Sequence, residues 1–139
     1  MGIYSTYKTD ESLETSGVVL VVGENDAGKK VGIKIARAGG ANKAFQRVLA
    51  AKTRPYRRQI EQNTMSNSVM EALMAEVYAD TVVLDWENVT DENDNPLDCT
   101  RENIIKVFTD LPDLFSDVRA GAADSSAFRA EILDAVVKN

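Results

Sequence analysis

Histidine is absent from this chain of 139 residues, and cysteine occurs once, at Cys99. Without histidine the chain lacks the commonest general base, the commonest ligand of transition metals and the partner of a serine or cysteine nucleophile. A single cysteine excludes an intrachain disulfide and every metal site that needs several thiolates. With 22 acidic residues, no pair of carboxylates stands out as an acid and a base. We therefore expect a protein that is not an enzyme, with no catalytic residues, no metal and no cofactor.

Long apolar runs are also missing. No stretch approaches the length of a membrane span, so we expect no association with a membrane. The first residues have neither the basic region nor the apolar stretch of a signal peptide, so we expect the chain to stay in the cytosol where it is made. With 44% hydrophobic and 27% charged residues, the composition is that of a soluble globular protein. A chain of this length fits one compact domain that folds without a metal or disulfide.

The charged residues are unevenly distributed along the chain, whose net charge is -6. Residues 27–60, the basic block, contain ten Lys/Arg and no Asp or Glu, whereas residues 61–100, the acidic block, contain ten Asp/Glu and no Lys or Arg. Segments adjacent in sequence are usually neighbours in space, so the two blocks could neutralise each other within the fold. Alternatively, one block is a docking surface for a charged partner. The sequence leaves both interpretations open.

The order of the apolar patterns predicts an α+β fold. Residues 1–16 are polar and predict an N-terminal arm without a core of its own, followed by a single globular domain over 17–139. A β-branched run at 18–22 and an alternating pattern at 31–36 predict an N-terminal antiparallel β-hairpin at about 17–37, with a long polar loop. After Gly39-Gly40 the apolar spacing becomes helical, which predicts a mainly helical part of about five helices over about 41–137.

Local signals mark where the helices begin. Capping residues and first-turn prolines predict starts at Asn42, Pro55, Ser66 or Asn67, Thr100, Pro112, and Asp124 or Ser125. The last of these helices would carry the apolar residues Phe128, Ile132, Leu133 and Val136. Gly121 is expected to end the helix that Pro112 begins. Residues 78–90 could be helix or strand; we favour a helix through Trp86, because no turn signal separates it from Tyr78.

The segment GENDAGKK at 23–30 matches most of the phosphate-binding pattern G-x-x-x-x-G-K. Lys30 stands where that pattern has the Ser/Thr whose hydroxyl holds Mg²⁺. An alternating strand pattern follows, where phosphate binding needs the N-terminus of a helix. We therefore interpret the segment as a polar hairpin loop and expect no nucleotide hydrolysis.

A second partial match lies at the loop expected for residues 91–98. Asp91, Asn93, Asn95 and Glu102 occupy positions 1, 3, 5 and 12 of a calcium-binding loop, but Pro96 stands where the pattern needs glycine. That glycine has a positive φ, which proline cannot adopt. We interpret the segment as an Asp/Asn-rich turn before the next helix.

The candidate partner-binding residues are Arg47, Arg54, Tyr56, Arg57 and Arg58. Their charge and aromatic content are typical of a nucleic-acid contact. The net charge of -6 would repel a phosphate backbone at long range, so we do not expect nucleic acid as the partner. Guanidinium groups pair bidentately with carboxylates, and we expect an acidic stretch of a protein to bind here.

Three segments resemble the tail assembly chaperones of long-tailed bacteriophages: IARAGGANKAFQRVLAAKTRPYRRQI, VYADTVVLDWENVTDENDNP and IIKVFTDLPDLFSDVRAGAADSSAFR. They cover about residues 33–130. The resemblance rests on the order of an Arg-x-Gly-Gly-x-Asn stretch, an Arg-Pro-Tyr-Arg-Arg block, a Trp-x-x-Val segment before an acidic turn, and a Leu-Pro-Asp-Leu-Phe helix start. It carries over no functional residue.

This resemblance implies a small, mainly helical, non-enzymatic protein of the host cytoplasm. Such a protein would bind the tape-measure protein, recruit tail-tube subunits during assembly and be absent from the finished virion. One alternative is a structural component of the phage tail. Another is a small phage protein that binds host nucleic acid or a defence factor. The oligomeric state is left open.

Overall fold

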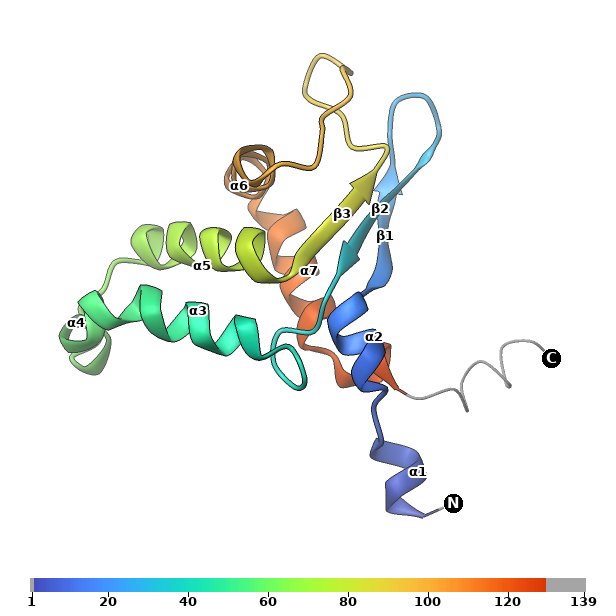
Figure 1. Ribbon diagram of the computed structural model, residues 1–139. Coiled ribbons are helices and arrows are strands. Elements are labelled where there is room, and N and C mark those ends of the chain that lie inside the picture. The colour runs from blue at the N-terminus through green and yellow to red at the C-terminus, as the bar shows by residue number, and fades with distance from the viewer. Residues whose placement is uncertain (1, 130–139) are drawn as a thin grey trace.

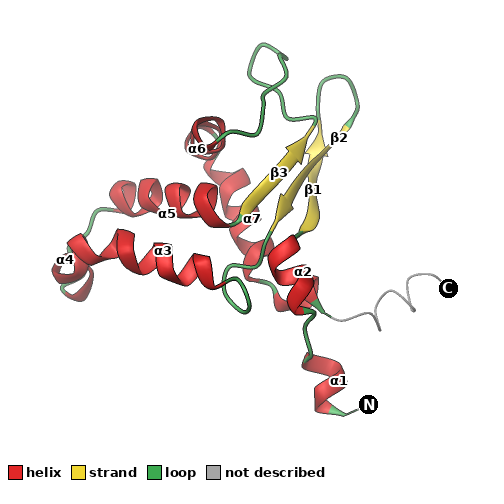
Figure 2. Cartoon of the chain, in the orientation of Figure 1, coloured by secondary structure: helices red, strands yellow, loops and turns green. Residues whose placement is uncertain are grey.

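A computed structural model describes residues 2–129 (Figure 1; Figure 2). In this range the α+β class and the early hairpin are confirmed. A three-stranded antiparallel sheet is combined with α-helices and two short 3-10 helices. In chain order the elements are α1 (Ile3–Tyr7), α2 (Glu11–Ser16), β1 (Val18–Glu24), β2 (Lys30–Ile35), α3 (Lys43–Thr53), η1 (Arg54–Tyr56), α4 (Arg57–Glu61), α5 (Asn67–Thr81), β3 (Val83–Glu87), α6 (Arg101–Asp110), α7 (Pro112–Ala123) and η2 (Ser125–Phe128).

The sheet has the strand order β1-β2-β3, with β2 in the centre. Ile33 of β2 lies opposite Leu20 of β1 and Trp86 of β3, and Ile33 and Ile35 are almost completely buried. Helix α7 packs against this apolar face, where its residue Val118 is fully buried. The main core therefore lies between one face of the sheet and the helices.

A chain of aromatic rings connects four helices through this core. Phe108 of α6 stacks on Phe115 of α7 with a centroid distance of 4.6 Å. Phe115 meets Tyr78 of α5 edge-on at 5.3 Å, and Tyr78 meets Phe45 of α3 edge-on at 5.8 Å. Such edge-on and offset contacts are favourable because the ring edge is positive and the face negative. Phe45 thereby anchors the start of α3 to the core.

The expectation of a helix through Trp86 is wrong. Helix α5 ends at Thr81, and Val83–Glu87 forms β3, which pairs antiparallel with β2. Pairing with β3 satisfies backbone groups on the second side of β2, which would otherwise be buried without partners. In the strand, Trp86 reaches the core, and its Nε1 donates a hydrogen bond to the Leu97 carbonyl at 2.9 Å. Long-range pairing thus overrides the missing turn signal.

Most of the helix starts are confirmed. The Ser66 hydroxyl accepts a hydrogen bond from the Val69 N–H at the start of α5, and the Thr100 hydroxyl accepts one from the Asn103 N–H at the start of α6. Pro112 stands in the first turn of α7, where its missing N–H costs no hydrogen bond. The break at Pro55 is present as η1 between α3 and α4.

Two local expectations are wrong. Asn42 precedes α3 but does not cap it, because its side-chain amide donates to the carbonyls of Arg37 and Thr81, each at 2.9 Å. Gly121 does not end α7, which continues to Ala123. A β-carbon at Gly121 would lie 3.2 Å from the Leu20 side chain, so glycine here permits close packing of α7 on β1.

Helix α2 lies in the segment for which the sequence predicts a polar arm, and its residue Glu14 is only 2% exposed. The Glu14 carboxylate accepts hydrogen bonds from Arg37 Nη1 at 2.9 Å, the Ala41 N–H at 3.1 Å and the Thr9 hydroxyl at 2.7 Å. Gly40, at φ +54°, passes so close to the carboxylate that a β-carbon would collide with it. We call Thr9, Glu14, Arg37, Ala41 and Asn42 the Glu14 cluster.

The last expected helix lies largely outside the described residues. Within them, residues 125–128 form η2, and Phe128 is fully buried. The Phe128 carbonyl accepts a hydrogen bond from the Asp10 N–H at 2.7 Å, which joins this segment to the start of α2. The other apolar positions expected for that helix, Ile132, Leu133 and Val136, are not among the described residues.

Replacing Glu14 should destabilise the fold. Burial raises the pKa of the Glu14 carboxyl, but the hydrogen bonds from Thr9, Ala41 and Arg37 together hold it below its ordinary value of 4.5. The carboxylate therefore stabilises the folded state fully above that value and less as the pH falls through the folded-state pKa. We expect Glu14→Gln to lower the free energy of unfolding at pH 7 by about 2 kcal/mol, measured by chemical denaturation.

The same measurement at acidic pH provides the internal check. As the pH falls below 4.5 and through the folded-state pKa, the wild-type carboxyl becomes protonated, so its difference from Glu14→Gln should shrink. The exposed Glu11 of the same helix gives the matched control, because Glu11→Gln removes an equal charge without a buried partner. Equal destabilisation by the two substitutions would contradict a special role for the Glu14 cluster.

Candidate functional site

A helical arm projects from the side of the sheet. It consists of α3, η1, α4 and the first half of α5, residues 43–72, and α4 lies at its tip (Figure 1). Helix α3 contains no buried residue. Its half-buried residues Phe45, Val48 and Leu49 recur at the i, i+3, i+4 spacing and lie on the side toward α5. The side of α3 that faces away from α5 is exposed.

The exposed side of α3 carries a stripe of positive charge. Lys43, Arg47 and Arg54 are all exposed, and the helical backbone continues through Arg54 with φ -52° and ψ -45°. At 3.6 residues per turn, these three positions fall within about 40° of one another around the helix. The apolar positions of α3 lie on the opposite side. The basic stripe therefore points away from α5.

Two further arginines lie at the tip of the arm. Arg57 and Arg58 belong to α4 and are exposed. Arg57 Nε lies 3.3 Å from Glu61 Oε1, and both side chains are more than half exposed, at 81% and 65%. An exposed pair of this kind is screened by water and contributes little to stability. The Arg57 guanidinium therefore remains accessible at the surface.

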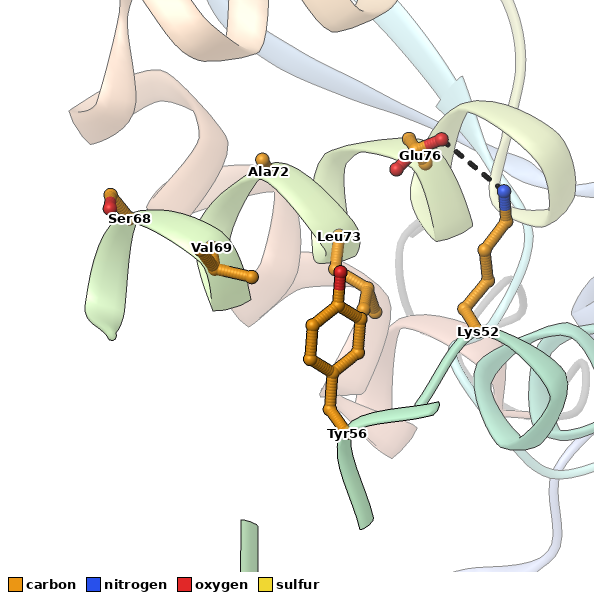
Figure 3. A pocket seen from close by; sticks show the side chains of 7 residues that line it. All are labelled: Lys52, Tyr56, Ser68, Val69, Ala72, Leu73 and Glu76. Carbon is orange, nitrogen blue, oxygen red and sulfur yellow. Dashed lines mark hydrogen bonds and ion pairs between the residues drawn. The ribbon is translucent and has the colours of Figure 1, made fainter. Parts of the chain in front are cut away.

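Tyr56 is separated from the arginines by its orientation. Its ring points into a groove of about 350 Å³ between η1 and α5, beside Leu73 (Figure 3). Lys52 Nζ and Glu76 Oε1 form an ion pair at 3.2 Å at one end of this groove. Val69 also lines it and is 39% exposed. The structure thus places Arg47, Arg54, Arg57 and Arg58 on outer surfaces and Tyr56 in an apolar recess.

The sequence does not reveal this groove. Val69 and Leu73 lie four residues apart on one side of α5, a spacing that is typical of a stripe facing the core. Leu73 is buried, but Val69, one turn nearer the start of α5, lines the groove and remains partly at the surface. The position of Tyr56 beside α5 depends on tertiary packing, and no spacing in the sequence marks it.

Most of the ion pairs that the acidic block forms are with the C-terminal helices α6 and α7. Arg101 Nε of α6 lies 2.7 Å from Asp80 Oδ1, and Arg119 Nη1 of α7 lies 3.1 Å from Glu71 Oε1. Lys106 of α6 is also within 3.7 Å of a carboxylate of the acidic block. These contacts place cations from outside the basic block against the acidic one.

Direct neutralisation between the basic and acidic blocks is limited. Among residues 2–129, the two blocks are joined by the Lys52–Glu76 and Arg57–Glu61 ion pairs alone. In the same range, Lys43, Arg47, Arg54 and Arg58 have no ion-pair partner within 4.0 Å. The arm is consequently a surface of largely uncompensated positive charge.

The two partial motifs form turns. Residues 25–29 connect antiparallel strands, so no helix N-terminus follows the GENDAGKK segment. In the second loop, Asp91 Oδ1 accepts hydrogen bonds from the N–H groups of Asn93 and Asn95, each at 2.9 Å. Led by the bond from Asn95, these contacts hold the pKa of the Asp91 carboxyl below its ordinary range. The Asp91 carboxylate therefore stabilises the turn of which it is a part.

Within the part of the chain that the structure describes, no group of three or more His, Cys, Asp or Glu side chains is arranged to hold a metal ion. None of the described helices combines the length and the apolar character needed to cross a membrane.

Comparison with known families gives the origin of the chain. Residues 40–139 match the family described as YdaY prophage protein. This match covers more than two thirds of the sequence. The chain therefore belongs to this family and is phage-derived. No curated protein and no solved structure matches the chain.

We predict that the loop before β2 does not bind nucleotide. The phosphate of a nucleotide needs converging backbone N–H groups at a helix N-terminus, and a strand begins here instead. Titration of Mg-ATP and Mg-GTP into the protein, followed by calorimetry, should give no binding heat. Lys29→Ala should behave identically. Micromolar affinity that disappears in Lys29→Ala would contradict this interpretation.

Proposed function

We propose that this protein is a tail assembly chaperone of a long-tailed phage. In this role it binds the tape-measure protein in the host cytoplasm, recruits tail-tube subunits while the tail is built, and catalyses no reaction. The proposal joins the prophage family match to the resemblance of residues 33–130 to such chaperones. The observation that carries it is the exposed, uncompensated positive charge of the helical arm.

The arm suits a partner with an acidic helical surface. Its stripe of Lys43, Arg47 and Arg54 extends along α3, and a rod-like helix lying beside it could place carboxylates at matching intervals. Arginine at two of these positions allows bidentate pairing. Because the side chains are already exposed, binding would require little rearrangement of the fold.

The groove adds an apolar contact next to the charged tip. Tyr56 lies between Arg54 and Arg57 in sequence, and its ring forms one wall of the recess. An apolar side chain of the partner could fill this recess while acidic groups meet the arginines. Charged contacts speed association and select the partner, whereas an aromatic anchor in a recess prolongs the complex.

The arginines at the tip provide the direct test. We expect the triple substitution Arg54→Ala, Arg57→Ala and Arg58→Ala to weaken binding of the tape-measure protein at least about tenfold, or about 1.4 kcal/mol. The readout is co-purification of the co-expressed partner, followed by titration at several salt concentrations. The loss should be greatest at low salt, where charge contacts are strongest.

A matched control removes three positive charges elsewhere. Lys29, Lys30 and Lys34 are exposed on the β-hairpin, away from the arm, and their substitution by alanine changes the net charge equally. This control should retain the partner. If the arginine variant folds normally and keeps full binding at low salt, the arm is not the docking surface.

Two further measurements separate the alternatives. A chaperone should be missing from purified virions, whereas a structural component of the tail would be detected there. Salt-dependent binding of DNA by the isolated protein would instead favour a role on nucleic acid.

A further inference from the structure

Strand β1 is an apolar edge strand with one side unpaired in the described structure. Among residues 2–129 it pairs with β2 only, and the backbone of residues 18–24 forms no hydrogen bond outside the sheet. Residues 18–23 contain neither a charged side chain nor proline. Natural sheets usually protect such edges with charge, proline or a covering element. The free edge of β1 can therefore accept another strand.

The two faces of β1 differ in exposure. Val18, Leu20 and Val22 are half-buried and belong to the core side of the sheet. Val19 and Val21 point to the opposite face and are 60% and 57% exposed. Figure 1 shows β1 on the side of the sheet away from the helical arm, so a strand added here leaves the arm accessible.

The sequence of this strand is a palindrome. Residues 17–23 read Gly-Val-Val-Leu-Val-Val-Gly in both directions, with Leu20 at the centre. When two copies of such a strand pair antiparallel about a two-fold axis at Leu20, residue types match at every position. Gly17 faces Gly23, Val18 faces Val22, and Leu20 faces its own counterpart.

We propose that a second copy of this chain pairs with β1, antiparallel and centred on Leu20, to form one six-stranded sheet across a dimer. In this register the core-facing residues of one copy lie opposite the core-facing residues of the other, and the exposed residues lie opposite the exposed ones. The apolar faces of the two sheets therefore lie on the same side of the joined sheet. The half-buried side chains Val18, Leu20 and Val22 then become continuous with those of the second copy. The exposed Val19 of each copy lies opposite Val21 of the other copy, so the two-fold axis gives two such pairs.

The charges and the β-branched side chains of this edge are compatible with pairing to a second copy. The first charged residue after the palindrome is Glu24, and its counterpart in this register is the neutral Ser16. No like charges therefore meet across the two-fold axis. The register irregularity between Val21 and Gly23 bends the end of the strand, so the central pairs would carry the contact. β-branched side chains at these pairs favour cross-strand packing.

The chain of 139 residues should sediment as a dimer at about 100 μM, where a micromolar dissociation constant gives mainly dimer. The double substitution Val19→Lys and Val21→Lys places like charges opposite each other at both outer pairs, and we expect a monomer. The double substitution Val19→Lys and Val21→Glu places opposite charges at the same pairs, and we expect a dimer. Circular dichroism establishes that both variants fold.

Ile60→Lys serves as a matched control, because Ile60 is a partly exposed β-branched residue at the tip of the arm. It should leave the dimer unchanged. A wild-type protein that remains monomeric at this concentration would overturn the proposal. Equal loss of the dimer in both double variants would overturn the register centred on Leu20, and full retention in the double-lysine variant would exclude β1 as the interface.

Discussion

The buried Glu14 carboxylate is the constraint on which the arrangement of this protein depends. A lone carboxylate would be costly to bury, and here it is compensated by three hydrogen bonds, one of them from Arg37. The bonds from Arg37 and Ala41 join α2 to the turn at 37–42, and Asn42 joins the same turn to the end of α5. Because β2 ends before this turn and α3 begins after it, the Glu14 cluster sets the direction in which α3 leaves the sheet.

The direction of α3 gives the helix one side that packs toward the core and an opposite side that is exposed. Phe45 reaches Tyr78 and anchors α3, while the opposite side of the helix stays outside the core. The basic residues Lys43, Arg47 and Arg54 lie on this exposed side and form no ion pair within residues 2–129. The acidic block is stabilised by Arg101 and Arg119 from the C-terminal helices instead. This division is the physical basis of the docking role that we propose for the arm, on a protein whose net charge is negative.

Local chemistry accounts for the elements that the sequence predicted correctly. The change from period-2 to helical spacing located the hairpin, and the hydroxyls of Ser66 and Thr100 located two helix starts. Asn42 is also a residue type that commonly caps helices, but its side-chain amide donates hydrogen bonds to the carbonyls of Arg37 and Thr81 instead. Val83–Glu87 likewise follows α5 without a turn signal. It is a strand because it supplies hydrogen-bond partners for the backbone on the second side of the central strand β2.

The sequence by itself determined the fold class, most of the helix starts and the positions of the basic residues along the chain. These properties depend on composition and on neighbours within a few residues. Only the tertiary structure decided that Glu14 is buried, that Tyr56 faces a groove, and that the basic and acidic blocks remain largely apart. Each of these outcomes depends on contacts between segments distant in the chain, and such contacts leave no periodic signal in the sequence.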